Sequence, residues 1–171
     1  MPTHRRSHII TDLQLELAFS RAEQVLEEHD KAGIKVIGID DPEFPPQLRT
    51  IANPPSVLYV KADINCLKPE RSVAVIGTRQ PSDYGKRTAA RIDQRFAEQG
   101  LIVVSGLVQG CDTVGHQGCL EGKGRTVAVL AHRLDRIYPA ENRELAQRIV
   151  EQSGYLVSEY SIVNNKLFKN Q

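Results

Sequence analysis

Short apolar runs that alternate with helical stretches constrain the fold of the second half of the chain more than any other feature. The runs are 73–76, 101–104, 126–130 and 155–157, and stretches with helical patterning, 83–99, 112–121 and 142–152, lie between and after them. Strands that are apolar throughout and alternate with helices are typical of a parallel sheet covered on both faces. The sequence therefore predicts an α/β fold, a Rossmann-like doubly wound and mostly parallel sheet.

A different pattern precedes this part. Apolar residues recur at the helical period after Thr11, with Thr11 or Asp12 available as the N-cap and Gly33 at the end. Two short apolar runs, 34–39 and 57–60, follow on either side of proline-rich turns and predict a hairpin. We expect an N-terminal helix and short-strand extension at 1–67 and a Rossmann-like domain at 68–171.

Charge and cysteine content limit the classes of function. The 171 residues carry a formal net charge of only +1, so a phosphate-binding surface would have to be a local patch. Cys66, Cys111 and Cys119 are an odd number at spacings that fit neither a disulfide framework nor a zinc site. The sequence has no long uncharged apolar run, so we expect a cytoplasmic protein with no membrane segment. From the cysteine spacing we expect no bound metal.

The first candidate ligand loop directly follows the run 73–76. Ligands of open α/β sheets bind beyond the carboxyl ends of the strands. Gly77 allows a tight turn and close approach of a ligand to the backbone, and Thr78 and Arg79 follow it, with Arg79 placed to hold a phosphate. No G-x-G-x-x-G pattern is present, so we expect no redox cofactor.

The second loop follows the run 101–104. Ser105, Gly106 and Gly110 would form a concavity of backbone amides suited to a phosphate. Asp112 can cap the next helix, and His116 shares its helical face. A Ser-His-Asp trio and a metal pair are alternatives, but no nucleophile elbow surrounds Ser105 and no third metal ligand is near, so a structural role for His116 is favoured.

The third loop follows the run 126–130 and is rich in charge. Tyr138 could stack on a base while Arg133, Arg136 and Arg143 hold phosphates. The alternative is a solvated loop with Asn142 as the cap of the next helix. The residues alone leave these two interpretations open.

Together these segments resemble the DprA/Smf family of DNA-processing proteins. The resemblance runs from about residue 33 to residue 160 and rests on V-A-V-I-G-T-R, V-S-G-L with G-x-D, D-x-x-x-H, L-D-R-I-Y-P, S-E-Y, D-P-E-F-P and P-P-S-V-L-Y. The family resemblance implies a homodimer that binds single-stranded DNA in a basic pocket and delivers it to a recombinase during natural transformation. It maps the phosphate pocket onto Gly77, Thr78, Arg79, Ser105, Gly106 and Gly110, and it makes Gln109, Asp112, His116 and Glu159 structural or pocket-lining residues.

The chain also departs from this family. A basic residue is usual where Gln109 stands, and glycines are usual where Ala131 and Arg133 stand. The sequence after Tyr160 lacks the arginine-rich F-P-x-R-N-R-I motif. We therefore expect a short or C-terminally truncated relative with weaker phosphate binding.

The sequence is compatible with three functions. In the first, Arg79, Arg133, Arg136 and Arg143 converge on one rim and bind single-stranded DNA for uptake and recombination. The alternative is a module that binds or senses a nucleotide without catalysis, and a third possibility is a purely structural, dimerising role. The P-G-G-x-G-T-x-x-E signature of the related phosphoribohydrolases is absent, so we expect no enzyme activity.

Overall fold

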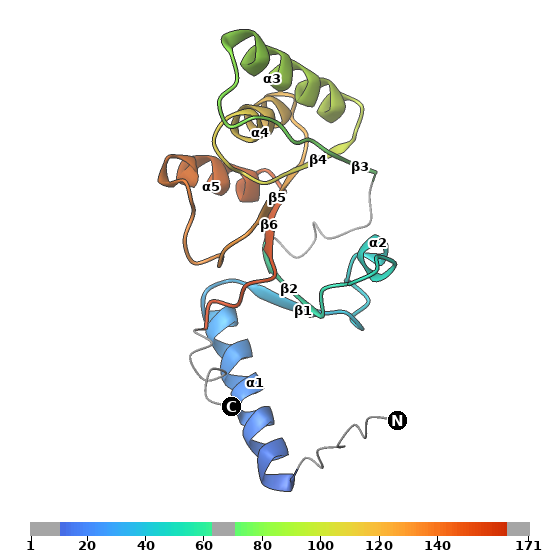
Figure 1. The fold of residues 1–171 in the computed structure, drawn as a ribbon, viewed down its shortest axis with the longest axis vertical. Helices are drawn as coiled ribbons and strands as arrows, with labels where there is room; N and C mark the ends of the chain where they lie inside the picture. The colour runs from blue at the N-terminus through green and yellow to red at the C-terminus, as the bar shows by residue number, and fades with distance from the viewer. Residues whose placement is uncertain (1–10, 63–70, 164–171) are drawn as a thin grey trace, which may run out of the picture.

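A single mixed sheet of six strands organises the protein (Figure 1), which we describe from a computed structural model of residues 11–62 and 71–163. The strand order is β1-β2-β6-β5-β4-β3. The strands are β1 (Lys35–Gly38), β2 (Val57–Lys61), β3 (Ser72–Ala74), β4 (Ile102–Ser105), β5 (Thr126–Leu130) and β6 (Tyr155–Ser158). The helices are α1 (Asp12–Lys31), α2 (Pro46–Arg49), α3 (Asp83–Glu98), α4 (Cys111–Glu121) and α5 (Arg143–Glu151), with a 3₁₀ turn, η2, at Ala140–Asn142.

The parallel part of the sheet runs from β3 to β6, as the alternating pattern predicts. Each neighbouring pair among β3, β4, β5 and β6 is parallel, whereas β1 and β2 form an antiparallel hairpin whose β2 pairs antiparallel with β6. The predicted α/β fold with a mostly parallel sheet is confirmed. The hairpin continues the same sheet, and the expected boundary between 67 and 68 lies outside the described residues.

The helices α3, α4 and α5 all lie on one face of this sheet (Figure 1). Side chains that are paired across a sheet point to the same face. The strand residues that pack against these helices belong to one such set: Val73, Val103, Ala128, Leu130 and Leu156. They meet Ala97 of α3, Leu120 of α4 and Ile149 of α5 in the core.

The opposite face is covered mainly at the hairpin end. There Phe44 and Leu48 pack against Ile37 and Leu58. Val129, which points to the same face from β5, is 49% exposed. The sequence predicts helices on both faces, but within the described residues α3, α4 and α5 cover only one. Each βαβ crossover adds its new strand on the same side of the previous one, so right-handed crossovers place all three helices on the same face.

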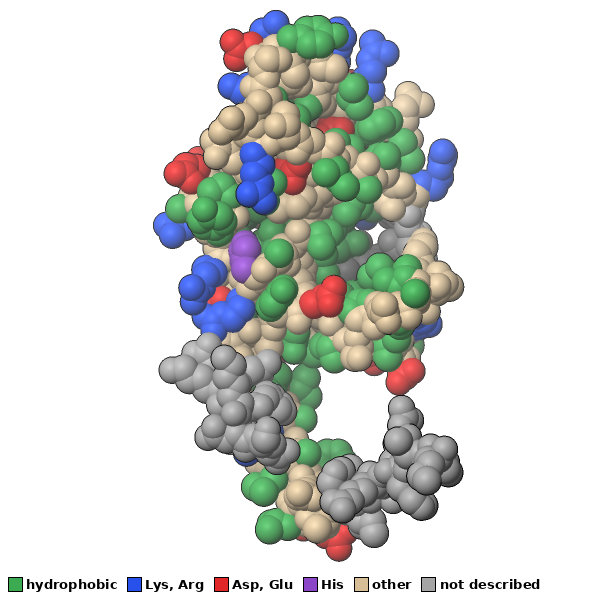
Figure 2. Space-filling view, in the orientation of Figure 1, with side chains coloured by type: hydrophobic (Ala, Val, Ile, Leu, Met, Phe, Trp, Pro, Cys, Tyr) green, Lys and Arg blue, Asp and Glu red, His purple; other side chains and the backbone are tan. Residues whose placement is uncertain are grey.

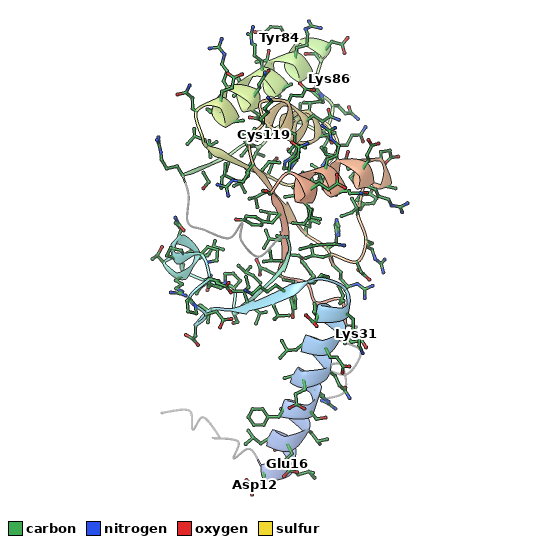
Figure 3. The ribbon with its side chains drawn as sticks, turned by 180° about the vertical axis from the view of Figure 1, so that it is seen from behind. Asp12, Glu16, Lys31, Tyr84, Lys86 and Cys119 are labelled. Atoms are coloured by element: carbon green, nitrogen blue, oxygen red, sulfur yellow. The ribbon has the colours of Figure 1, made fainter. Side chains whose placement is uncertain are left out.

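Helix α1 projects from the rest of the protein (Figures 1 and 3). It begins with the predicted cap: the Thr11 hydroxyl accepts a hydrogen bond from the Gln14 backbone amide, and the Gln14 side-chain oxygen accepts one from the Thr11 backbone amide. His29, its one buried residue, stacks on Tyr59 at 4.5 Å between ring centroids and accepts a hydrogen bond from the Ile162 amide. The leucines of α1 are largely exposed, so among the residues that the structure describes its apolar spacing does not correspond to burial.

The sequence places most element boundaries within two residues. The largest shift is in the first parallel strand, which is expected to reach Ile76 but ends at Ala74, with Val75 still donating to the Val104 carbonyl. Ile76 is exposed. No helix within 11–62 or 71–163 has the length and apolar character needed to cross a membrane.

Candidate functional site

The loops that follow β3 and β4 are locked against each other. The Cys111 amide donates to the Thr78 carbonyl at 3.0 Å. Gly110 has a φ of +97°, and a Cβ there would lie 2.4 Å from that same carbonyl oxygen. At Gly77, a Cβ would lie 2.3 Å from the Cβ of Cys111. The space beside Gly77, where the sequence predicts a ligand, is therefore filled by Cys111.

Several polar groups that we expected to face a phosphate are used within the protein. The Gly106 amide donates to the buried Asp112 carboxylate at 3.0 Å, and the Ser105 hydroxyl donates to the Val75 carbonyl at 2.8 Å. The Thr78 hydroxyl accepts from the Gln80 amide at 3.2 Å. These groups fix the shape of the loops, so Gly106 and Ser105 do not form the expected cradle of free donors.

A cavity of about 680 Å³ nevertheless opens where the three predicted loops meet. It combines Arg79 from the first loop, Gln109 and Gly110 from the second and Tyr138 from the third. Tyr138 is 73% exposed at its rim. The remaining lining residues are Gln80, Pro81, Lys86, Thr113, Val114, Pro139, Ala140, Glu141 and Asn142.

Asn142 fastens the third loop to the second. Its side-chain amide donates to the Leu107 carbonyl and to the Thr113 hydroxyl, each at 2.9 Å, and that hydroxyl donates to the Val108 carbonyl at 2.8 Å. Asn142 makes no side-chain capping bond to α5, in contrast to the expected cap. Its buried amide instead sets the position of the loop that carries Tyr138.

His116 lies in the core and away from this cavity. Its Nδ1 is 2.7 Å from the Thr126 hydroxyl, which donates to the Val103 carbonyl at 2.7 Å, so the histidine is the donor in the first bond. Burial lowers the pKa of His116 to about 4. A neutral, enclosed imidazole that is hydrogen-bonded to Thr126 is not placed to activate Ser105 or to bind a metal.

Arg133 is held by the protein itself. Its guanidinium donates to the Ile162 carbonyl at 3.0 Å and to the Asp135 carboxylate at 2.7 Å. Arg133 does not line the cavity that contains Arg79.

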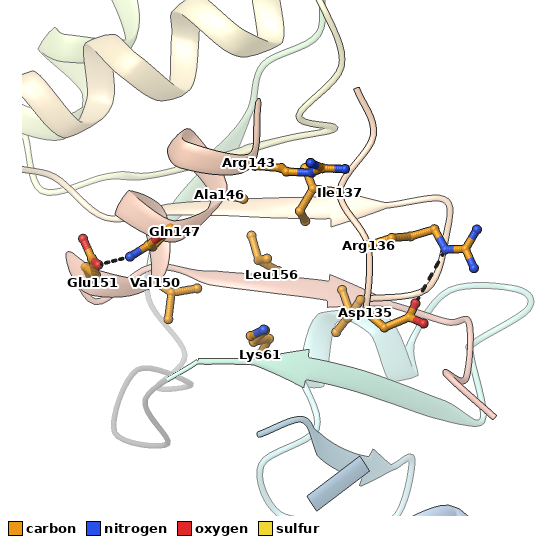
Figure 4. A pocket seen from close by; sticks show the side chains of 11 residues that line it. Lys61, Asp135, Arg136, Ile137, Arg143, Ala146, Gln147, Val150, Glu151 and Leu156 are labelled. Atoms are coloured by element: carbon orange, nitrogen blue, oxygen red, sulfur yellow. Dashed lines mark hydrogen bonds and ion pairs between the residues drawn. The ribbon is translucent and has the colours of Figure 1, made fainter. Parts of the chain in front are cut away.

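Arg136 and Arg143 surround a second cavity, of about 500 Å³, together with Lys61 (Figure 4). Its floor includes Ala146 and Leu156. The four arginines expected on one rim are thus divided: Arg79 lines one cavity, Arg136 and Arg143 line the other, and Arg133 lines neither of these two.

Two further findings concern residues outside these cavities. Glu159 lines a third cavity, of about 650 Å³, on the face of the sheet that α3, α4 and α5 leave free. Within 11–62 and 71–163, no three His, Cys, Asp or Glu side chains gather as potential metal ligands.

Lys86 is the functional candidate that sequence reasoning missed. It lies in the first turn of α3, lines the cavity beside Arg79, and its Nζ is 3.6 Å from the Asp83 carboxylate. A lysine four residues after a helix N-cap next to a proposed phosphate loop is a signal that could have identified it, since helices begin at the ligand edge of such sheets.

Comparison with known proteins places this geometry in context. The model of the family described as DNA recombination-mediator protein A matches residues 35–170. The chain is 39% identical over 142 residues to protein Smf from Synechocystis, covering 81% of this chain and 35% of the relative. It is 33% identical over 147 residues to the DNA processing protein DprA of Bacillus subtilis, covering 86% of this chain and 49% of the relative.

Two solved structures are similar in fold. The crystal structure of DprA from Streptococcus pneumoniae matches with a TM-score of 0.67 and 30% identity, over 84% of this chain and 51% of that one. A DprA structure from Helicobacter pylori, described for its mode of binding single-stranded DNA, matches with a TM-score of 0.63 and 30% identity, over 74% and 56% of the two chains. The chain thus spans about a third to a half of these two curated relatives.

Proposed function

Because this chain belongs to the DNA recombination-mediator protein A family, we propose that it binds single-stranded DNA in the cavity where the three strand-end loops meet, and that it serves DNA uptake and recombination in natural transformation. The observation that carries the proposal is the meeting of Arg79, Lys86 and Tyr138 around one cavity, from three separate segments.

The chemistry of these three side chains suits a nucleic-acid strand. A guanidinium binds phosphate oxygens through paired donors, and an ammonium adds a second positive charge. An exposed tyrosine ring offers a surface on which a base can stack. No carboxylate among the described residues forms an ion pair with Arg79, so its charge is available to a ligand.

The proposed role is binding without catalysis. The Ser105 hydroxyl is committed to the Val75 carbonyl, and His116 is enclosed beside Thr126. A nucleophile and a base must come within hydrogen-bonding reach of each other and of the substrate. Ser105 and His116 instead form hydrogen bonds with other groups of the protein. We further propose that the protein is cytoplasmic, forms a homodimer and passes the DNA to a recombinase. The family resemblance supports these three points.

Fluorescence anisotropy with a labelled oligo(dT) of about 20 nucleotides tests the proposal. The protein should bind the oligonucleotide at low salt, and its affinity should fall as salt is added, because binding to phosphates releases counterions. Arg79→Ala should lower the affinity about tenfold or more and reduce the salt slope by about 0.7 per lost phosphate contact.

Arg21→Ala provides the matched control. It removes one exposed arginine from α1, the helix at the end of the protein opposite α3 (Figure 1), and should leave the affinity unchanged. Absence of binding at low salt, or equal affinities of the Arg79 variant and the wild type, would refute the proposal. Thermal stabilisation by mononucleotides without oligonucleotide binding would instead identify a nucleotide-binding module.

A further inference from the structure

Three arginines form a row along the outer side of α3. Arg87, Arg91 and Arg95 recur every fourth residue, and all three side chains are exposed. Four residues advance an α-helix by about 6 Å, so neighbouring guanidinium groups can follow one line along the axis. We call this row, together with Tyr84, the α3 strip. Tyr84 is 71% exposed in the first turn of the helix.

The charges of the α3 strip are not neutralised by the protein. Within the described residues Arg87, Arg91 and Arg95 form no ion pair, whereas Lys86 pairs with Asp83. Lys and Arg side chains stand out around the α3 end of the molecule (Figure 2). The net charge of +1 conceals this concentration, because six carboxylates and two basic residues, Arg21 and Lys31, lie on the distant helix α1.

Close packing against α4 fixes which side of α3 faces outward. A Cβ at Gly118 would lie 2.1 Å from the Ala90 carbonyl oxygen, so the two backbones approach each other directly. Asp93 and Ala97 are the buried residues of α3, on the side that faces α4. The arginines lie on the other side of the helix, and rotation of α3 that would hide them is prevented by this contact.

The α3 strip also begins at the proposed DNA site. Lys86, in the first turn of α3, lines the cavity that contains Arg79, and Arg87 lies about 100° further around the same turn. Figure 3 shows Tyr84 and Lys86 together at the same end of the helix. A strand leaving the cavity past Lys86 would turn around the N-terminal end of α3, meet Tyr84 and Arg87 there, and then meet the other two arginines.

We propose that the α3 strip binds the continuation of the DNA strand held in the cavity, with Arg87, Arg91 and Arg95 on successive phosphates and Tyr84 stacking on a base. This inference rests on the proposed function and extends the binding site along one helix. Guanidinium groups suit the task because they pair with phosphate oxygens in a bidentate way.

Oligonucleotides of two lengths separate the α3 strip from the cavity. The variant Arg91→Gln/Arg95→Gln is compared with Arg21→Gln/Lys31→Gln, which removes the same number of charges from α1. We expect the α3 variant to bind oligo(dT) of about 20 nucleotides several-fold to tenfold more weakly with a smaller salt slope, and to bind one of about 6 nucleotides as the wild type does. The α1 variant should match the wild type at both lengths.

The outcomes distinguish this inference from the proposed function. If wild type binds and Arg79→Ala weakens binding, but the α3 variant equals the α1 variant, only the α3 strip is refuted. Equal losses at both lengths would also overturn it, because the arginines would then act on the cavity or through overall charge. If no oligonucleotide binds the wild type, both proposals fail. Matching thermal midpoints of the variants exclude a folding defect as the cause.

Discussion

The carboxylate of Asp93 on α3 occupies the space that a side chain would need at Gly115 on α4. A Cβ at Gly115 would lie 2.1 Å from Asp93 Oδ2. Asp93 is 1% exposed, and neither of its carboxylate oxygens has a hydrogen-bond partner among the described residues. The contact joins the helix of the α3 strip to the helix that follows the second loop.

The variant Gly115→Ala should lose about 1–3 kcal/mol of unfolding free energy, because the added methyl group must displace Asp93 in a close-packed interface. Adding Asp93→Ala should restore much of that loss, since it removes the group that clashes. Urea unfolding of the two single variants and the double variant measures this coupling. Strictly additive losses would show that the two residues do not constrain each other.

The stability of the protein should depend on pH through Asp93. Burial, and secondarily the charge of Asp112, raise the pKa of Asp93 to about 6, whereas an aspartate of the unfolded chain titrates near 4. The folded state then holds the proton more tightly, so this group's contribution is complete below about pH 4 and is lost as pH rises to about 6. Asp93→Asn should therefore be more stable than wild type at pH 7, by on the order of 2 kcal/mol.

His116 acts in the opposite direction over an overlapping range. Because burial lowers its pKa to about 4, its contribution is lost as pH falls from about 6.5 toward 4. In wild type, protonation of Asp93 partly compensates for the stability lost at His116 as the pH falls. Asp93→Asn lacks this compensation, so its unfolding free energy should fall more steeply at acid pH. Free energies of urea unfolding between pH 4 and pH 8 test the pair of effects, and parallel curves for the two proteins would contradict them.

Thr126 should be important for stability through its hydroxyl. Thr126→Val leaves the His116 Nδ1 donor and the Val103 carbonyl without this partner in the core. Leaving buried polar groups unsatisfied costs about 1–3 kcal/mol. Thr126→Ser keeps the hydroxyl and should lose less. Thermal unfolding compares them, and a valine variant as stable as the serine variant would rule out a structural role for the hydroxyl.

Arg133 and Arg79 should differ in kind. Arg133→Ala loses the bonds to Ile162 and Asp135 and should lower the unfolding free energy by about 1–2 kcal/mol, with oligonucleotide affinity unchanged. Arg79→Ala should show the reverse pattern. Measuring the thermal midpoint and the affinity on the same preparations tests the contrast. A large loss of affinity in the Arg133 variant would show that Arg133 contributes to DNA binding.

Tyr138 should contribute through its ring. Stacking of a base on an aromatic side chain is worth about 1–3 kcal/mol, so Tyr138→Ala should weaken oligo(dT) binding about tenfold, while Tyr138→Phe should bind nearly as well as wild type. Anisotropy titrations at one fixed salt concentration provide the comparison. An equal loss in both variants would assign the effect to the hydroxyl instead.

The parallel part of the fold was predictable because most residues of its strands are apolar. The apolar run 126–130 coincides with β5, Thr126–Leu130. What the pattern could not give is the side of the sheet on which each helix lies, since this depends on the order in which strands are added. The order from β6 to β3 puts α3, α4 and α5 on one face.

The candidate site was predictable as a set of loops and less so as a set of atoms. Position at the strand ends was enough to bring Arg79, Gln109 and Tyr138 to one cavity. Sequence could not foresee that Asp112 would take the Gly106 amide. It also could not foresee that the third loop would separate Tyr138 from Arg136, because loop direction is set by tertiary contacts such as those of Asn142.

The antiparallel pairing of β2 with β6 has a consequence for the order of folding. Tyr59 pairs with Ser158, so the hairpin meets its partner strand only after β3, β4, β5 and β6 have been synthesised. Loop closure between such distant segments is slow because its entropy loss precedes the gain from contact. The nascent hairpin therefore has an open strand edge until β6 leaves the ribosome, and the pairing of β2 with β6 then joins the two parts of the sheet.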